Sequence, residues 1–442
     1  MIATYASAAL ICAVSLLVGR AVLSLAGGRE WSWLEPAVGF GAVLTVTGLL
    51  ARAPGHGTSA TLGVVLLVLA ATAIVWWGDD RTPGAWREGL PVALVVVAVL
   101  SIPFAISGRW GLLGVGFNND LGLHLAWAEW LRSGFGPDAE PGYPLGPHGL
   151  AVAVAALPGI GLGQAFIGQI VAIGAMTGLT ALGALRSLTP GRRTLAAAMV
   201  ALPYLAASYY AQAAFKETAA ALLVLAFAIW LTRFEGVPEG WRKRLLFALP
   251  PLALVGGIFF SYSFAGVAWP VAILVLWSLT LPPVRAALRP RSLLRFLLRP
   301  LTLLTLVVLI GLALLVTIGP FGFAGAFNKV AASNTYGPVS ALEALGIWPT
   351  SNYRLNAEGS VRLPALAGTI SILALLAGVA WWTRRRELTI PVALGGTALL
   401  YLASLPTSGD YSQAKALIIM APLAMLVIVR PLLEEFPRLG RR

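Results

Sequence analysis

Apolar runs recur along the whole chain, and each is long enough to cross a membrane. A transmembrane helix needs about 20 consecutive apolar residues, because the hydrocarbon core of a bilayer is roughly 30 Å thick. The pattern of hydrophobic and polar positions therefore predicts an all-α polytopic membrane protein with thirteen transmembrane helices. The expected spans lie at residues 2–19, 33–51, 58–77, 88–107, 163–187, 194–212, 215–233, 244–261, 263–281, 300–319, 362–383, 388–405 and 414–430.

One apolar stretch, at residues 148–161, is too short to cross the membrane. Only about a dozen apolar residues precede Pro158 and Gly159, and such a segment is typical of a re-entrant or interfacial helix. Residues 148–187 are then expected to cross once. The two long polar connections, residues 108–147 and 320–361, consequently lie on the same side of the membrane.

Composition excludes an ordinary soluble enzyme. Of the 442 residues, 58% are hydrophobic and 11% charged, whereas an average soluble domain has about 25% charged residues. The single Cys12 excludes an intramolecular disulfide and a cysteine metal cluster. A net charge of +13 would suggest nucleic acid in a soluble protein. Here the alternation of basic loops explains the charge, so no nucleic-acid partner is expected.

Basic residues are concentrated in alternate connections, which predicts an orientation. By the positive-inside rule, loops rich in Lys and Arg face the cytoplasm. This rule places the N-terminus and both long connections outside an inner (plasma) membrane and the C-terminus in the cytoplasm. Because no basic region precedes the first apolar run, that run is expected to be a span rather than a cleaved signal. Nineteen Lys and Arg residues fall within residues 186–193, 233–244, 285–299, 384–386 and 430–442.

The connection 108–147 contains a segment with helical periodicity. Residues 120–132 have apolar positions along one side, which predicts an external juxtamembrane helix lying on the membrane surface. Asp120 and His124 are four residues apart and share one face of that helix. Asp120 also follows Asn118 and Asn119 at a position that suits an N-cap. Capping is therefore the alternative interpretation of this aspartate.

An ordered set of residues follows the fourth predicted span. Asp120 comes first, His124 stands four residues later, and an Ala/Leu-rich helix ends at Gly134. The motif YPLG at residues 143–146, with His148 after it, opens the short apolar segment. This order resembles the first external loop of GT-C superfamily glycosyltransferases. These integral-membrane enzymes use polyprenyl-phosphate sugars, as do the protein mannosyltransferases and the aminoarabinose transferases of lipid A.

The resemblance implies a division of the chain into three parts. Residues 88–235, about a third of the chain, would form a GT-C-like core with the catalytic loop 108–147. Residues 1–87 would be extra N-terminal transmembrane helices. Residues 236–442 would be C-terminal transmembrane helices with the external loop 320–361. The implied function is an inverting glycosyltransferase on the outer face, with a polyprenyl-phosphate-linked sugar as donor, a glycan, lipid or protein as acceptor, and membrane lipids as surroundings.

Such a reaction indicates a role for each candidate residue. The acceptor hydroxyl must lose a proton to a carboxylate base, which the resemblance assigns to Asp120, and the departing phosphate needs cations. Glu217 falls where the family often has an acidic residue opening a span from outside. The candidate cations for the donor phosphate are Arg354, Lys329, Lys216 and Lys415. The candidate acceptor or sugar contacts are His124, His148, Glu217, Trp348 and Tyr353.

Ordinary structural roles remain open for these residues. Lys216 and Lys415 can anchor spans at the interface, and Glu217 can cap its span and pair with Lys216. Trp348 and Tyr353 can belong to an interfacial aromatic belt, and His148 can be structural. No cofactor is expected. A divalent metal is an alternative whose ligands fit no known spacing, and Leu121 stands where the family often has a second acid. The possible ligands would be Asp120, His124, His148, Asp138 and Glu140.

Two further functions are compatible with the sequence. A lipid-linked saccharide flippase or transporter would break no covalent bond, but it would more often need ionisable groups near the middle of its spans. Arg20 is the one possible exception to their scarcity there. A non-catalytic membrane subunit that keeps the fold is the third possibility.

Overall fold

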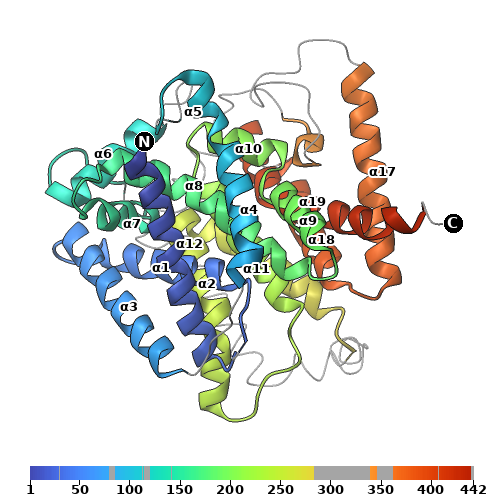
Figure 1. The fold of residues 1–442 in the computed structure, drawn as a ribbon, viewed down its shortest axis with the longest axis horizontal. Coiled ribbons are helices and arrows are strands. Elements are labelled where there is room, and N and C mark those ends of the chain that lie inside the picture. Colours follow the sequence, from blue (N-terminus) through green and yellow to red (C-terminus); the bar gives the residue numbers. More distant parts are fainter. Residues whose placement is uncertain are drawn as a thin grey trace.

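The chain is a bundle of α-helices in a computed structural model. The structure describes residues 1–28, 30–78, 85–111, 113, 120–140, 142–282, 339–345, 362–406 and 408–439, and within these ranges all regular structure is helical. Figure 1 shows the helices packed around a common centre. Their bounds are α1 (Ile2–Leu25), α2 (Glu35–Leu50), α3 (Gly57–Trp77), α4 (Ala85–Leu100), α5 (Ile102–Ser107), α6 (Asp120–Ser133), α7 (Gly146–Ala155), α8 (Leu162–Ala181), α9 (Pro190–Ala201), α10 (Tyr204–Ala211), α11 (Lys216–Leu231), α12 (Trp241–Ser278), α17 (Arg362–Arg384), α18 (Thr389–Ser404) and α19 (Asp410–Leu439), with 3₁₀ turns η1 (Leu182–Ala184) and η2 (Ala341–Leu345).

The protein is a multi-pass membrane protein by the length and hydropathy of its helices. Among the described residues, seven helices are long and apolar enough to cross a bilayer, or eight if α9 and α10 form one bent span. The thirteen expected spans are not all shown. The helices α2, α11 and α18 have 16 residues each, fewer than the roughly 20 needed for a crossing. The expected span 300–319 lies outside the described residues.

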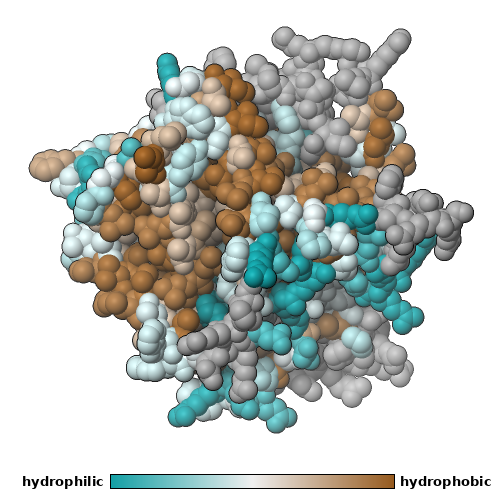
Figure 2. Space-filling model, viewed as in Figure 1, coloured by the Kyte–Doolittle hydropathy of each residue, from teal (hydrophilic) through white to brown (hydrophobic). Residues whose placement is uncertain are grey.

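The burial of the helices separates a centre from a lipid-facing periphery. All of the most apolar window of α8 and 83% of that of α19 are buried, whereas only 17% of that of α3 and 22% of that of α17 are buried. Figure 2 shows hydrophobic residues spread over α1, α3 and α4, while hydrophilic residues gather toward the lower and right-hand edges. A helix that is apolar all round and exposed in the protein alone is typical of contact with lipid.

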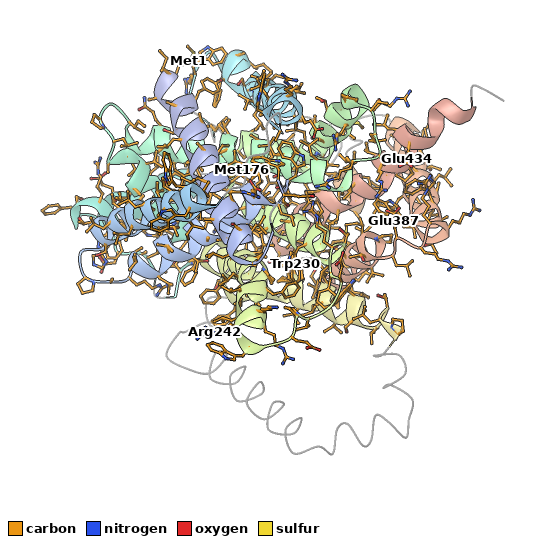
Figure 3. The ribbon with its side chains drawn as sticks, turned by 60° about the horizontal axis from the view of Figure 1, so that its bottom comes forward. Met1, Met176, Trp230, Arg242, Glu387 and Glu434 are labelled. Carbon is orange, nitrogen blue, oxygen red and sulfur yellow. The ribbon has the colours of Figure 1, made fainter. Side chains whose placement is uncertain are left out.

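Three of the predicted basic clusters meet at one end of the bundle. Arg385 pairs with Glu434 and Arg430 with Glu387, both at 2.8 Å, and the Ser187 hydroxyl, within the first cluster, donates to Glu434 at 2.7 Å. Arg193 of the same cluster pairs with Glu88 of α4 at 2.8 Å. Figure 3 shows Glu387 and Glu434 on neighbouring segments. We call this end, marked by Arg193, Arg385 and Arg430, the basic end.

The end of the bundle opposite the basic end carries site residues that the sequence predicts. Lys216 begins α11 and Lys415 lies in the second turn of α19, and both helices then run toward the basic end. We call the end at Lys216 and Lys415 the site end. Figure 3 shows Met1 and Arg242 on opposite sides of the bundle. Arg20 pairs with Glu35 at 3.3 Å near the end of α1, so it does not stand in the middle of a span.

The long helix α12 folds back on itself at Ser263. Its 38 residues would extend about 57 Å as one straight helix, but the Phe234 ring lies 5.9 Å from that of Phe247 and 5.1 Å from that of Trp277. Both ends of α12 are therefore beside one residue. The backbone of Ser263 is non-helical, with φ 72° and ψ −164°. The predicted turn at residues 261–263 is confirmed by this reversal.

Helices α7 and α8 begin at the same end of the bundle. His148, in the first turn of α7, has its ring 5.5 Å from that of Phe166, in the second turn of α8. The chain between these residues does not cross the bundle, as the sequence predicts. The next predicted span, 194–212, is broken instead. Its halves α9 and α10 meet at Pro203 and are bent by 61°, because proline cannot donate the backbone hydrogen bond that a continuous helix needs.

Candidate functional site

Five of the predicted site residues meet at the site end. His124 lies on α6 and His148 on α7, while Lys216 and Glu217 open α11 and Lys415 lies on α19. The surface helix that carries His124 begins at Asp120, as expected, and it buries Trp127, Ala128 and Leu131. Its apolar stripe fixes the rotation of α6, and that rotation turns His124 toward the bundle.

The two histidines contact each other inside an aromatic cage. His148 Nε2 lies 3.2 Å from His124 Nδ1, so one imidazole donates to the other. Both side chains are buried. Burial lowers the pKa of His148 to about 3 and that of His124 well below its ordinary value, and the charge of Lys216 acts in the same direction. Both imidazoles are therefore neutral at physiological pH. The surrounding rings belong to Trp127, Tyr143, Phe166 and Phe215.

Tyr143 connects this cage to Lys216. The Nζ of Lys216 donates to the Tyr143 hydroxyl at 2.5 Å and lies 4.9 Å from the ring centroid. On the other side, Nη2 of Arg52 donates to the Tyr143 carbonyl at 2.7 Å. The loop between α2 and α3 also contributes His56, whose ring lies 4.9 Å from that of Trp130 on α6. Tyr143 is therefore held from its backbone and from its hydroxyl at once.

Glu217 and Lys415 form a buried ion pair between α11 and α19. Lys415 Nζ lies 3.1 Å from Glu217 Oε1, and the side chains are only 11% and 3% exposed. Lys415 Nζ also lies 4.2 Å from the Tyr411 ring centroid. The sequence offered Lys216 as the ion-pair partner of Glu217, but the structure pairs Glu217 with a residue almost two hundred positions away. Breaking a buried pair by removing one partner typically costs about 3–5 kcal/mol.

Three strained turns surround these groups. Non-glycine residues rarely have positive φ, yet His56, Ala213 and Ser263 have φ values of 38°, 61° and 72°. Ala213 precedes Lys216 by three residues, and Ser263 follows Tyr262 at the reversal of α12. Backbone strain of this kind tends to gather at functional sites. Three of the four described non-glycine residues with positive φ lie at the site end, and the fourth, Arg386 with φ 62°, lies at the basic end.

Several predicted site residues fall outside the described part of the chain. These are Arg354, Lys329, Trp348 and Tyr353. Asp120 begins α6, but its side chain also lies outside the described part. Within the ranges that the structure describes, no three His, Cys, Asp or Glu side chains gather as metal ligands would.

Sequence reasoning did not single out Arg52 or the aromatic cage. Arg52 lies in the short connection between the predicted spans 33–51 and 58–77. Counting crossings would have placed this connection on the same side as residues 108–147. Phe166 and Phe215 lie inside predicted spans, where an aromatic residue carries no signal of its own.

The charges at the site end favour an anion. Among the described side chains that meet there, Lys216, Lys415 and Arg52 carry positive charges and Glu217 a negative one, while the two imidazoles are neutral. Comparison of the chain with protein-family models, curated proteins and solved structures finds no match.

Proposed function

We propose that the protein is a GT-C-type inverting glycosyltransferase that transfers a sugar from a polyprenyl-phosphate donor at its site end. The observation that supports this most is the convergence of Lys216, the Glu217–Lys415 pair and the histidine pair next to the helix that Asp120 begins. These groups come from four helices that are far apart in sequence.

The positive-inside rule supports an external location for this chemistry. Arg193, Arg385 and Arg430 mark the basic end, which the rule places in the cytoplasm. The site end then faces outward in the plasma membrane, and the chain would cross thirteen times if the short helices and the span expected at 300–319 are counted. A lipid-linked donor fits a site at the outer surface of the membrane, because its tail stays in the bilayer while its sugar lies just outside.

The proposed reaction is a single displacement at the anomeric carbon. The acceptor hydroxyl gives its proton to the Asp120 carboxylate, and the hydroxyl oxygen attacks the anomeric carbon from the side opposite the phosphate. The bond between that carbon and the phosphate oxygen breaks, and the polyprenyl phosphate leaves with the additional negative charge. Lys216 and the other positively charged side chains of the site stabilise that charge. Arg354 and Lys329 are assigned to the same phosphate as part of the proposal.

The decisive experiment replaces Asp120 with asparagine in the full-length protein. Asp120→Asn is nearly isosteric and asparagine also suits a helix N-terminus, but the change removes the base, so transfer from polyprenyl-phosphate sugars should fall about 10²–10⁴-fold. Donor binding and expression should stay at the level of the parent. The measurement is transfer of labelled sugar in membranes, with a panel of donors. A variant that turns over like the parent would reduce Asp120 to a helix cap.

A flippase or transporter of lipid-linked saccharides is the second candidate. The bent pair α9–α10 favours it, because discontinuous helices often form transport sites. The same membranes separate the two functions. Movement of the labelled donor between leaflets without any transfer to an acceptor would support the transporter, whereas transfer supports the enzyme.

A further inference from the structure

The hydrogen bond between His148 and His124 can run in two directions. His148 Nε2 lies 3.2 Å from His124 Nδ1, and both imidazoles are neutral at physiological pH because burial lowers their pKa values. A neutral imidazole has one N–H and one nitrogen with a lone pair. If His148 donates, its own Nδ1 has the lone pair and His124 carries a proton on Nε2. If His124 donates, these two outer nitrogens exchange their roles.

The surroundings of His148 Nδ1 decide between the two directions. This nitrogen is fully buried, and within the described part of the chain it has no hydrogen-bond partner. The Phe166 and Phe215 rings lie 5.5 Å and 5.7 Å from the His148 ring. A proton on Nδ1 would therefore be a buried donor without an acceptor, and such donors are rarer in proteins than acceptors with an unused lone pair. His148 accordingly donates to His124, which carries its own proton on Nε2.

His124 is the histidine of the pair that lies beside the cations of the site. It keeps 5% exposure, whereas His148 has none. Besides burial, the charges of Lys216 and Lys415 both lower the pKa of His124, but only that of Lys216 lowers the pKa of His148. The His124 ring also lies 5.8 Å from the ring of Tyr143, whose hydroxyl accepts a hydrogen bond from Lys216. The Nε2–H of His124 is therefore a donor next to two lysines.

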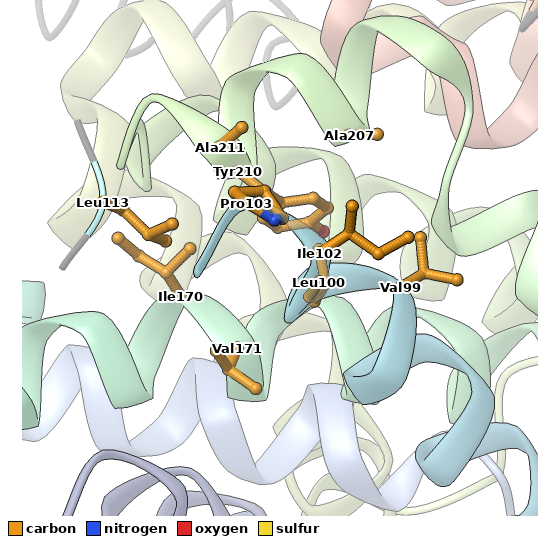
Figure 4. A pocket seen from close by; sticks show the side chains of 10 residues that line it. All are labelled: Val99, Leu100, Ile102, Pro103, Leu113, Ile170, Val171, Ala207, Tyr210 and Ala211. Atoms are coloured by element: carbon orange, nitrogen blue, oxygen red, sulfur yellow. The ribbon is translucent and has the colours of Figure 1, made fainter. Parts of the chain in front are cut away.

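The described cavity between α4, α5, α8 and α10 offers an anion no such group of donors. Its volume is about 210 Å³. Figure 4 shows its walls, which are apolar apart from Tyr210 and include Val99, Ile170 and Ala207. A charge that is buried without a partner loses its hydration without compensation. A phosphate is therefore expected at the site end rather than in this cavity.

We infer that His124 donates a hydrogen bond from Nε2 to a phosphate oxygen as a neutral group, and that His148 is a positioning residue that keeps the proton on that nitrogen. The identity of the ligand as a polyprenyl phosphate rests on the proposed function, whereas the direction of the bond between the histidines does not. A neutral N–H adds a hydrogen bond to an anion without the loss on deprotonation that a cationic imidazole would show. His124 then contacts the donor phosphate rather than the sugar.

Nitrogen NMR of the full-length protein in lipid nanodiscs tests the two tautomers. The chain has three histidines, so labelling with ¹⁵N-histidine gives a spectrum that single variants can assign. At about pH 8, where an ordinary imidazole is neutral, His124 and His148 should both carry the proton on Nε2. His56 is the internal control. Its Nδ1 lies 2.9 Å from the Ala51 carbonyl oxygen, which can only accept, so its proton is on Nδ1. A proton on Nδ1 of His124 would overturn the inference.

Dipolar coupling between ¹⁵N and ³¹P tests the ligand in the same sample. Bound polyprenyl phosphate should weaken the Nε2 signal of His124 through its phosphorus and leave the signals of His56 unchanged. Inorganic phosphate with the same effect at the same concentration would support the phosphate contact but not the lipid-linked donor. Coupling in a protein without transferase activity would likewise support the inference and contradict the proposed function. An active transferase without this coupling would overturn the inference alone.

Two substitutions of His124 measure the contribution of its N–H. His124→Phe keeps a ring in the aromatic cage but removes the donor, so the dissociation constant of polyprenyl phosphate should rise about tenfold or more. His124→Gln is the matched control, because its amide can donate from about the position of Nε2, and affinity should stay within about threefold of the parent. In His148→Phe, the Nδ1 resonance of His124 should move toward that of a nitrogen without a hydrogen bond. Parental affinity in His124→Phe, or an unmoved resonance in His148→Phe, would overturn the inference.

Discussion

Lys216 and Lys415 are both lysines near a helix start at the site end, yet their surroundings differ. Lys415 is buried against the Glu217 carboxylate, which balances its charge and fixes its position. Lys216 is half-buried and contacts the hydroxyl and ring of Tyr143. Of the two lysines, Lys216 is therefore the more accessible to a ligand. In the proposed enzyme, this residue would meet the phosphate and Lys415 would hold α19 in place.

Lys216→Gln should accordingly weaken the binding of polyprenyl phosphate. Loss of a hydrogen bond to a charged group costs about 1.5–3 kcal/mol, so the dissociation constant should rise by roughly ten- to a hundredfold. Arg192→Gln is the control, since Arg192 is exposed beside Arg193 at the basic end. The measurement is titration of the purified protein with polyprenyl phosphate. Equal affinity in both variants would remove Lys216 from the phosphate site.

The histidine pair should make the protein sensitive to acid. The pKa of His148 is lowered from 6.5 to about 3, so below pH 6.5 the unfolded chain binds a proton that the folded chain does not. Stability should therefore fall by about 1.4 kcal/mol per pH unit between pH 6.5 and 3. His148→Phe keeps an aromatic ring and should reduce the slope, as measured by thermal unfolding in detergent at several pH values. If His148→Phe keeps the parental slope, the pair is not the cause.

At the scale of elements, the sequence indicates reversals between two helices more clearly than bends within one predicted helix. The reversal at residues 261–263 was predictable, because two apolar runs of span length adjoin there. The short helix α7 was also predictable from Pro158 and Gly159. The 61° bend of α9–α10 was not, although Pro203 marks its position, because proline is tolerated in many continuous membrane helices. The three 16-residue helices are shorter than their apolar runs, since apolar residues continue into the adjoining turns.

Close packing of the two limbs of α12 can be tested with one methyl group. A Cβ on Gly266 would lie 2.6 Å from Ile258 Cγ2, which is closer than two carbon atoms can approach. Gly266→Ala should therefore destabilise the protein by about 1–3 kcal/mol. Gly395→Ala on α18 has its nearest neighbour at 4.0 Å and should be neutral or slightly stabilising. Thermal unfolding of both variants in detergent gives the comparison, and equal midpoints would contradict the packing of the limbs.

At the scale of the whole molecule, alternation of charge predicted which segments share an end. The pairs Arg385–Glu434 and Arg430–Glu387, with the hydrogen bond from Ser187 to Glu434, show that the segments around Ser187, Arg385 and Arg430 lie together. The contacts within the site were not predictable in the same way. His124 and His148 are 24 residues apart, and Glu217 and Lys415 lie on helices whose order in space the sequence does not state. Hydropathy predicts how deep in the membrane a residue lies. Which residue of another helix it contacts there depends on how the helices pack.

Cysteine labelling in intact cells tests the orientation. Asp138→Cys and Ser340→Cys, in the two long connections, should react with a membrane-impermeant thiol reagent from outside, whereas Arg242→Cys at the opposite end should not. The native Cys12 lies within α1, and the parent protein reports its background. The reverse pattern of labelling would place the site in the cytoplasm, where polyprenyl-phosphate sugars of the proposed kind would not meet it.

The central position of α19 has a consequence for biosynthesis. Glu217 enters the membrane with α11, but its partner Lys415 arrives only with α19, the last described helix to be made. The ribosome adds about 5–20 residues per second, so the 178 residues between Leu231 and Asp410 take roughly 10–40 s. During that interval Glu217 has no Lys415 to pair with. The position that α19 will occupy among the other helices must also remain accessible from the surrounding lipid. The nascent bundle is therefore expected to be the stage at which membrane chaperones or proteases act on this protein.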